Sequence, residues 1–240
     1  MTTPGRKMRI LVFQHIAVEH PGSFRAMMAA DGIAWDTVAL DEGDAIPPLG
    51  GYAALLVMGG PMDVWEDDRY PWLAAEKDAI RRWVTDGRPF LGVCLGHQLL
   101  AAALGGRVGL MPAPEVGIID VTLTDPADPL FAGLASPLSC LQWHGAEVQV
   151  PPPGAVVTAD NDACRVQAMR VGTAAWGIQF HVEVTPQTVP EWSAIPTYAA
   201  SLQRVLGDGG GARFEAEAAA RMPAFSAAAE TVWANFRRLL

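Results

Sequence analysis

Residues 90–100 read Phe-Leu-Gly-Val-Cys-Leu-Gly-His-Gln-Leu-Leu, which predicts an apolar strand followed at once by a helix, with Cys94 at the junction. The Gly92-x-Cys94-x-Gly96 spacing is that of a nucleophile elbow, in which small flanking residues let the chain turn sharply and lift the central side chain above the sheet. At the N-terminus of a helix, the unpaired N–H groups favour thiolate over thiol. The segment therefore indicates a reactive cysteine. A buried core cysteine is the alternative, because free cysteines are among the most buried residues.

A histidine and a glutamate two residues apart supply the partners that such a cysteine needs. Residues 177–183 read Gly-Ile-Gln-Phe-His-Val-Glu. Residues two apart on a strand share a face, so the pattern predicts that His181 and Glu183 emerge on the same side. Alone, such a pair is common on solvated strand faces. Together with Cys94 it predicts a triad, in which His181 takes the thiol proton and Glu183 orients the imidazole.

Two glycines follow another apolar run. Residues 52–58 read Tyr-Ala-Ala-Leu-Leu-Val-Met, a buried strand that ends at Gly59-Gly60-Pro61. Glycine permits the close backbone approach that oxyanion donors need, so the amides of this turn are candidates for stabilising a tetrahedral intermediate. A Gly-Gly-Pro turn taken by itself also fits a simple strand terminator.

These three segments together resemble the class I, triad-type glutamine amidotransferases. The matching motifs lie at 58–61, 92–98 and 180–183, in the family's order and at roughly its separations, and the resemblance covers about residues 50–190. It implies glutamine or another γ-glutamyl compound as substrate, no cofactor, and thioester chemistry. The roles that it implies are Cys94 as nucleophile, His181 as general base and acid, Glu183 as orienting carboxylate, and the amides of Gly60 and Leu95 as oxyanion hole.

The same resemblance implies residues that bind the substrate. Gly59 and Gln98 belong to the matching motifs, and Gln98 is expected to hold the glutamine substrate. Residues 142–145 read Gln-Trp-His-Gly and resemble the loop that closes over the substrate in stand-alone members of the family. Trp143 and His144 are therefore predicted to lie on the substrate side of the site.

The remaining histidines are interpreted as structural. His15 and His20 follow the first predicted strand, and lone histidines in loops are usually solvated. His97 is interpreted as a residue of the helix start rather than as a second base.

Composition argues against several kinds of partner. The 240 residues are 50% hydrophobic and carry a formal net charge of −9, with a pI near 4.9, which disfavours nucleic acid or an anionic membrane as a ligand. No run approaches the ~20 apolar residues of a membrane span, and residues 1–7 lead into a strand at 8–13 rather than into a signal peptide. The three cysteines, Cys94, Cys140 and Cys164, show no C-x-x-C spacing, which is consistent with a reducing compartment, no metal site and a cytoplasmic protein.

Strand and helix patterns alternate along the first half of the chain, which predicts an α/β fold with a mostly parallel central sheet flanked by helices, of the flavodoxin-like kind. Residues 117–179 divide into short apolar segments that predict a small mixed or antiparallel extension of this sheet. The predicted segments are 116–123, 139–142, 156–159, 165–170 and 174–180. We expect one catalytic domain over 1–240, with a core at about 8–190 and a helical segment at about 189–240 whose last part, 225–240, docks on that core. The predicted strands are 8–13, 33–40, 52–58 and 89–93, and the predicted helices are 21–30, 72–86 and one beginning near 97.

Three functions remain open on the sequence. The first is a glutamine-hydrolysing amidotransferase whose ammonia passes to a synthetase on another chain, because the sequence has no Walker A motif and leaves no room for an acceptor-activating domain. The second is a stand-alone γ-glutamyl hydrolase or peptidase that passes the acyl group to water. The third is a non-catalytic binding module on the same fold, which the retention of Cys94, His181 and Glu183 disfavours.

Overall fold

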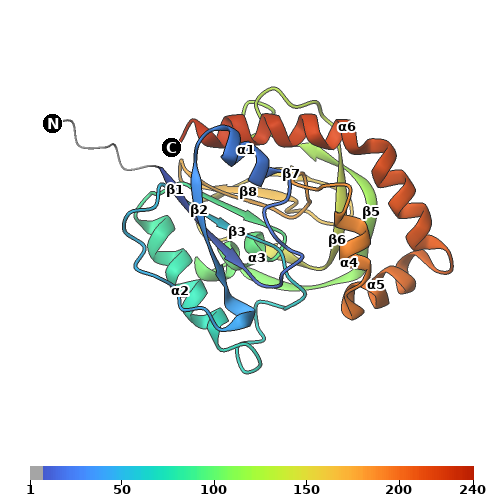
Figure 1. Ribbon diagram of the computed structural model, residues 1–240, viewed down its shortest axis with the longest axis horizontal. Coiled ribbons are helices and arrows are strands. Elements are labelled where there is room, and N and C mark those ends of the chain that lie inside the picture. The colour runs from blue at the N-terminus through green and yellow to red at the C-terminus, as the bar shows by residue number, and fades with distance from the viewer. Residues whose placement is uncertain (1–7) are drawn as a thin grey trace.

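A nine-stranded sheet with helices on both faces forms the centre of the protein (Figure 1). The computed structural model describes residues 8–240, so the expectation for residues 1–7 lies outside the described residues. The strands are β1 (Arg9–Gln14), β2 (Ala34–Ala39), β3 (Ala54–Val57), β4 (Phe90–Val93), β5 (Arg107–Leu123), β6 (Leu138–Val150), β7 (Ala155–Asp160), β8 (Ala168–Val171) and β9 (Ala175–Ile178). The helices are α1 (Phe24–Ala30), α2 (Trp72–Thr85), α3 (Leu95–Ala103), α4 (Thr188–Ser193), α5 (Pro196–Leu206) and α6 (Gly210–Arg237), with a 3-10 turn η1 (Leu40–Glu42).

One half of the sheet is parallel. Strands β2, β1, β3, β4 and β9 are neighbours in that order and all run in the same direction. Their apolar sequences suit strands buried on both faces. In β1, Ile10 and Val12 pack with α1 and α6 on one face, whereas Leu11 and Phe13 pack with α2 and α3 on the other. The predicted α/β fold with helices flanking a mostly parallel central sheet is confirmed, and the carboxyl ends of these strands meet at one edge.

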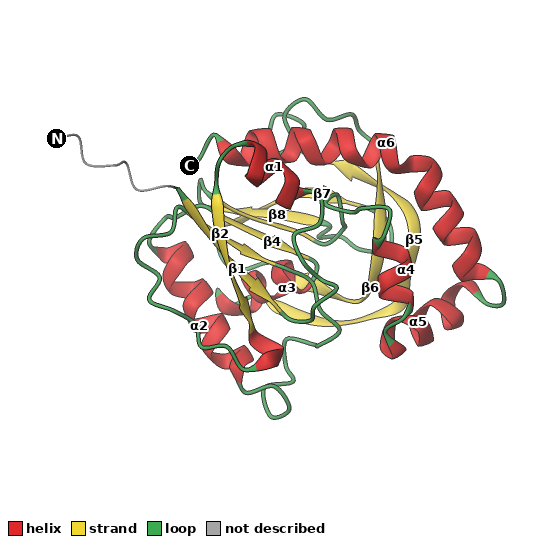
Figure 2. Cartoon of the chain, viewed as in Figure 1, coloured by secondary structure: helices red, strands yellow, loops and turns green. Residues whose placement is uncertain are grey.

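The antiparallel half of the sheet is larger than predicted (Figure 2). Strands β8, β7, β5 and β6 continue the sheet beyond β9, and β5 and β6 form a long hairpin of 17 and 13 residues. The sequence predicted only the second half of β5 and the start of β6. Pro112 and Pro114 argue against a strand, since proline cannot donate to the ladder. The structure accommodates both in a register shift between Leu110 and Glu115, where pairing is interrupted.

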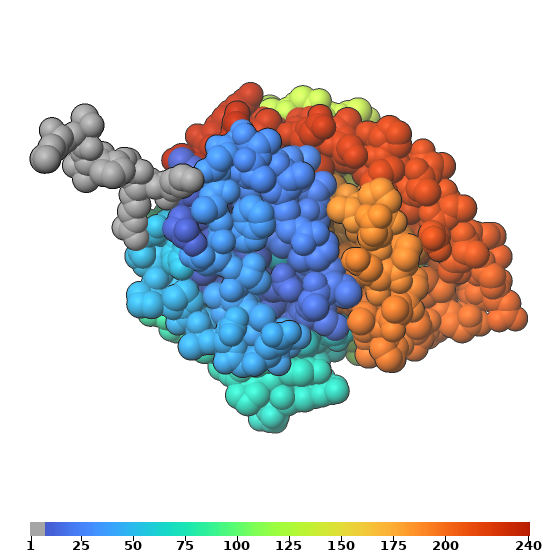
Figure 3. Space-filling view, in the orientation of Figure 1, coloured from blue at the N-terminus to red at the C-terminus, as the bar shows by residue number. Residues whose placement is uncertain are grey.

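The C-terminal helices return across the sheet. The ring of Trp233 in α6 lies 5.8 Å from that of Phe24 in α1, and its Nε1 donates to Asp31 at 2.8 Å. Asn235 of α6 donates to the carbonyl oxygens of Leu130 and Ala132. The predicted docking of residues 225–240 is confirmed. On the face drawn in Figure 3, α4 and α5 fill the space between the N-terminal strands and helices and α6.

Candidate active site

Cys94 lies in the turn between β4 and α3, at the carboxyl edge of the parallel strands. Its backbone adopts φ 52° and ψ −104°, and within residues 8–240 it is the only residue other than glycine with a positive φ. Such a conformation costs on the order of 1–3 kcal/mol and persists only where the surrounding structure enforces it. The strained turn agrees with the elbow geometry that the Gly92-x-Cys94-x-Gly96 spacing predicts.

The two glycines of the motif are required by close backbone packing. A Cβ atom at Gly92 would lie 2.4 Å from the carbonyl oxygen of Gly96, and one at Gly96 would lie 2.1 Å from the carbonyl oxygen of Val57. Both obstacles are main-chain atoms, which cannot rotate away as a flexible side chain can. The spacing around Cys94 therefore has a steric reason that is independent of any chemistry.

We expect Gly96→Ala to lower the free energy of unfolding by at least the ~1–3 kcal/mol typical of overpacking, because β3 and α3 must separate to admit the methyl group. Urea unfolding followed by circular dichroism measures this. Gly50→Ala is the matched control, since nothing lies within 4 Å of a Cβ there. Equal unfolding midpoints for the two variants would contradict the steric explanation of the elbow.

His181 and Glu183 are in direct contact, with 2.7 Å between Nδ1 and Oε1. The prediction that His181 and Glu183 share a strand face is wrong, because β9 ends at Ile178. The chain beyond it is held by a single bridge, in which the His181 N–H donates to the carbonyl oxygen of Leu141 at 2.9 Å. The Glu183 carboxylate is fixed by the Val182 N–H, 3.1 Å from Oε2. A local bend, rather than strand alternation, brings imidazole and carboxylate together.

The other imidazole nitrogen of His181 is available to Cys94. Within the described part of the chain, Nε2 has no hydrogen-bond partner. The ring is fully buried and packs edge-on against Trp192, with 4.7 Å between the ring centroids. Burial lowers the pKa of His181, but Glu183 and Cys94 outweigh it and raise the pKa well above its ordinary value. The Cys94 thiol also accepts from Gln179 Nε2 at 3.5 Å. The imidazole of His181 is thus held between the Glu183 carboxylate and the Cys94 sulfur.

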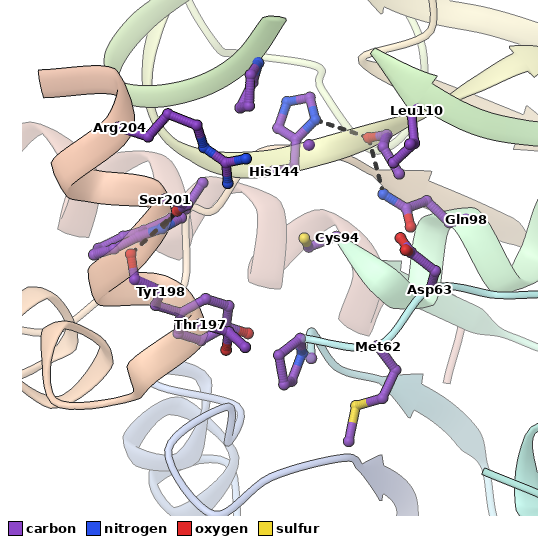
Figure 4. A pocket seen from close by; sticks show the side chains of 16 residues that line it. Met62, Asp63, Cys94, Gln98, Leu110, His144, Thr197, Tyr198, Ser201 and Arg204 are labelled. Carbon is purple, nitrogen blue, oxygen red and sulfur yellow. Dashed lines mark hydrogen bonds between the residues drawn. The ribbon is translucent and has the colours of Figure 1, made fainter. Parts of the chain in front are cut away.

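A cavity of about 230 Å³ opens above Cys94. In Figure 4, Cys94 lies between α5, which carries Tyr198, Ser201 and Arg204, and the segment that carries Met62 and Asp63. The residues lining the cavity are Gly60, Pro61, Met62, Asp63, Cys94, Gln98, Leu110, Pro114, Trp143, His144, Gly145, Ala146, Thr197, Tyr198, Ser201 and Arg204.

The residues predicted as an oxyanion hole lie side by side. Leu95 is the first residue of α3, where the N–H has no acceptor within its own helix. Gly60 lines the cavity, and a Cβ atom there would lie 3.0 Å from Cδ2 of Leu95. Gly59, predicted to bind the substrate, is not among the residues that line the cavity. A Cβ atom on Gly59 would lie 2.4 Å from Oε2 of Glu19, and its carbonyl oxygen accepts a hydrogen bond from His15.

The other residues predicted to bind the substrate all line the cavity. Gln98 donates from Nε2 to the carbonyl oxygen of Ala146 and to Gln179 Oε1, both at 3.1 Å, so its amide group is held in the wall. Trp143 and His144 lie within β6, so the prediction of a loop at residues 142–145 is wrong. Trp143 donates to Ser201 Oγ at 2.8 Å, and this bond ties β6 to α5.

His144 is held from both sides of its ring. Nδ1 donates to the carbonyl oxygen of Ala146 at 2.9 Å, and Nε2 lies 3.1 Å from Oε2 of Glu115 on the neighbouring strand β5. Glu115 also accepts from Asn161 and Gln167. These contacts fix the position of His144 in the cavity wall.

Sequence reasoning missed the wall formed by α5. Thr197, Tyr198, Ser201 and Arg204 line the cavity about 100 residues after Cys94, and no motif marks them. It also missed Asp63, which follows the Gly-Gly-Pro turn. Burial, aided by Glu66, raises the pKa of the Asp63 carboxyl group. The α5 wall follows only from the long-range packing of the C-terminal helices.

Two of the histidines interpreted as structural are buried. The expectation that His15 is solvated in a loop is wrong, because its side chain is fully buried and forms hydrogen bonds through both ring nitrogens. His97 lies in the first turn of α3, where its Nε2 donates to the carbonyl oxygen of Val166 at 3.0 Å and burial lowers its pKa to about 3. A neutral, backbone-bonded His97 supports the structural interpretation. His20 is half-buried, and its Nδ1 accepts from the Gly22 N–H at 3.1 Å.

Two features are absent from the described residues. Over 8–240, no three or more His, Cys, Asp or Glu side chains are grouped so that they could hold a metal ion. None of the helices in this range is both long and apolar enough to cross a membrane.

Comparisons with solved structures agree with this fold. A glutamine amidotransferase from Thermotoga maritima superposes with a TM-score of 0.86 and 25% sequence identity, covering 95% of this chain and 97% of the other. A glutamine amidotransferase from Methylobacillus flagellatus gives 0.85 and 28% identity, covering 98% and 95%. The curved sheet and its helices are thus those of glutamine amidotransferase structures.

Sequence comparisons lead to the same family. The glutamine amidotransferase-like protein YfeJ of Salmonella typhimurium is 33% identical over 76% of this chain and 78% of its own length. One of the subunits of the glutamine-hydrolysing GMP synthase of Ignicoccus hospitalis is 38% identical over 58% of this chain and 70% of its own. The family model described as glutamine amidotransferase class-I matches residues 26–191. With about two thirds of its length matched, this chain belongs to the class-I glutamine amidotransferase family.

Proposed function

We propose that the chain hydrolyses the side-chain amide of glutamine through a thioester on Cys94 and releases ammonia for an acceptor on another chain. The observation that carries this proposal is the position of Cys94, at a strained turn beneath the cavity and beside the buried His181–Glu183 pair. We also propose that 1–240 act as one catalytic domain in the cytoplasm, since α5 and α6 pack on the core and all three cysteines are free.

The first half-reaction forms the thioester. His181 takes the thiol proton, and Cys94 Sγ attacks the amide carbon to form a tetrahedral intermediate whose oxygen carries the negative charge. The N–H groups of Gly60 and Leu95 stabilise this oxyanion. The C–N bond then breaks, His181 returns its proton to the departing nitrogen, and ammonia leaves.

The second half-reaction regenerates the enzyme. Water replaces ammonia in the site, His181 takes a proton from it, and the hydroxyl attacks the thioester carbon. The C–S bond breaks, glutamate is released, and the proton on His181 returns to the Cys94 sulfur. Glu183 orients the imidazole and stabilises the imidazolium that forms in each half.

The identity of the ammonia acceptor is suggested by the relatives. Several of them are named as subunits of glutamine-hydrolysing GMP synthases, and these match more than half of this chain. A synthetase chain that receives ammonia from this site is therefore the partner that we propose.

A stand-alone γ-glutamyl peptide hydrolase is the second candidate. The observation that favours it is the wall formed by α5, where Arg204 stands exposed at the rim of the cavity above Cys94. A guanidinium group there suits the carboxylate of a residue attached to the γ-glutamyl group. This candidate uses the same triad and differs only in the leaving group.

We expect the isolated chain to hydrolyse glutamine slowly, because enzymes that deliver ammonia to a partner commonly complete their site only when the partner docks. A γ-glutamyl hydrolase needs no partner and should reach ordinary turnover, on the order of 1–10³ per second. Steady-state release of ammonia from glutamine is compared with release of glutamate from a panel of γ-glutamyl peptides, using purified monodisperse protein. Fast peptide turnover by the lone chain would favour the second candidate, and fast glutamine turnover would refute partner gating.

A further inference from the structure

Behind the Gly-Gly-Pro turn lies a buried chain of hydrogen bonds that the catalytic steps above do not use. His15 follows β1, and its Nδ1 lies 2.8 Å from the carbonyl oxygen of Gly59. Its Nε2 lies 2.9 Å from Oε1 of Glu76 on α2. Both side chains are fully buried, and the imidazole stacks on the Trp72 ring with 5.5 Å between the ring centroids. The segment after β1 and helix α2 thus act together on one peptide group.

The partners of His15 determine where its protons lie. A carbonyl oxygen can only accept, so Nδ1 must carry a hydrogen and donate to Gly59. On the other side of the ring, Nε2 faces the Glu76 carboxylate at 2.9 Å. Burial lowers the pKa of His15, but Glu76 and the Gly59 carbonyl outweigh it and raise the pKa above its ordinary value. The donor to Gly59 is therefore permanent, and Glu76 holds the ring in the orientation that directs it.

The group held in this way belongs to the candidate oxyanion hole. The carbonyl of Gly59 and the N–H of Gly60 are the two ends of one planar, trans peptide, so they point in opposite directions. When His15 holds the carbonyl away from the cavity, the N–H of Gly60 is turned toward it. Gly60 lines the cavity beside Cys94, as this orientation requires.

Side chains crowd both glycines of this peptide, so neither position admits a larger residue. A Cβ atom at Gly60 would lie 2.8 Å from Cβ of His15, and one at Gly59 would lie 2.4 Å from the carboxylate of Glu19. Glu19 is itself buried and accepts from the hydroxyl of Tyr198 on α5 at 2.5 Å. Without the hydrogen bond from His15, the two glycines would allow the peptide to flip, because glycine populates both signs of φ readily.

We propose that His15, oriented by Glu76, is a positioning residue that fixes the Gly59–Gly60 peptide with its N–H directed at the oxyanion formed above Cys94. This inference rests on the proposed function, because it concerns the same acyl-transfer step. His15 touches no reacting atom and acts only through the main chain. Its loss should therefore weaken stabilisation of the tetrahedral intermediate and leave the Cys94 nucleophile in place.

We expect His15→Phe to lower kcat for the preferred γ-glutamyl substrate by about 10- to 100-fold with KM little changed, less than the ~10²–10³-fold cost of removing an oxyanion donor outright. His15→Asn should recover much of this loss, since its amide nitrogen can replace Nδ1. Alkylation of Cys94 by iodoacetamide forms no oxyanion, so its rate should not change in either variant. A parallel fall in the alkylation rate would overturn the proposal and indicate a general disturbance of the site.

Trp83→Phe is the control for lost stability. Trp83 lies on the same helix as Glu76, is buried, and donates to the Pro89 carbonyl oxygen at 2.9 Å outside the cavity. The Trp83→Phe variant should have a lower melting temperature and an unchanged kcat. A drop in kcat as large as that of His15→Phe would attribute the effect to stability and refute the positioning role.

Crystal structures of the wild type and His15→Phe separate this inference from the proposed function. We expect the Gly60 N–H to face Cys94 in the wild type and the Gly59–Gly60 peptide to rotate or become disordered in the variant. If the wild type turned over no γ-glutamyl compound, the proposed function would fail, and the peptide orientation would still decide the role of His15. An unchanged peptide in the variant would overturn the inference.

Discussion

Cys94→Ala should leave the fold intact and reduce hydrolysis of glutamine and γ-glutamyl peptides to background, a loss on the order of 10⁶-fold, as for removal of a triad nucleophile elsewhere. No other thiol can substitute. Burial raises the pKa of Cys140 well above its usual range and that of Cys164 to about 12, so both remain protonated. Release of ammonia and glutamate measures the loss, and an unchanged melting temperature establishes that the variant is folded.

Covalent labelling tests the same assignment without relying on turnover. A glutamine-analogue electrophile should modify Cys94 and spare Cys140 and Cys164, because Cys94 is the only one of the three cysteines that lines the cavity. Peptide mass spectrometry locates the modified residue. Cys140→Ser is the matched control and should label as the wild type does. Modification of Cys140 in the wild type, or residual turnover in Cys94→Ala, would exclude Cys94 as the nucleophile.

The parts of the site that were predictable from sequence are those specified by local chemistry. The turn at Cys94 needs glycine on both sides because main-chain atoms of Gly96 and Val57 occupy the space of any Cβ. A steric requirement of this kind leaves a short, fixed pattern in the sequence. The same holds for the apolar runs of β1, β3 and β4, where burial on both faces demands continuous hydrophobic residues.

The parts that were not predictable depend on contacts between distant segments. Tyr198 of α5 bonds to Glu19 near the N-terminus, and Ser201 accepts from Trp143 of β6. Neither pair has a sequence spacing that reveals it. The β5–β6 hairpin was underpredicted for the opposite reason, since Pro112 gives a strong local signal against a strand and the register shift overrides it.

The histidines show how a pattern can predict a contact for the wrong reason. The pairing of His181 with Glu183 was expected from strand alternation, yet a bend held by Leu141 produces it. His15 was expected to be solvated because its sequence neighbours suggest a loop. Its carboxylate partner, Glu76, lies 61 residues away, and burial of such a pair is invisible until the helix that carries Glu76 is placed.

His181→Asn should reduce kcat by more than ~10²-fold, because both half-reactions lose their proton carrier. Glu183→Gln should cost less, since a neutral acceptor can still orient the Nδ1 proton across the 2.7 Å contact. Steady-state kinetics on the preferred γ-glutamyl substrate measure both losses. Near-native turnover of His181→Asn would contradict the triad.

Glu183→Gln should also change the pH profile, and this separates an orienting carboxylate from a purely structural one. Although burial lowers the pKa of His181, the charge of Glu183 is the foremost influence raising it, so the neutral variant should have a lower pKa. Protonated His181 donates to the leaving nitrogen, and activity is lost as pH rises through its pKa. The alkaline limb should therefore move to lower pH in Glu183→Gln and stay in place in Glu191→Gln, an exposed carboxylate on α4. An unmoved limb would mean that Glu183 holds the bend of the chain without tuning the base.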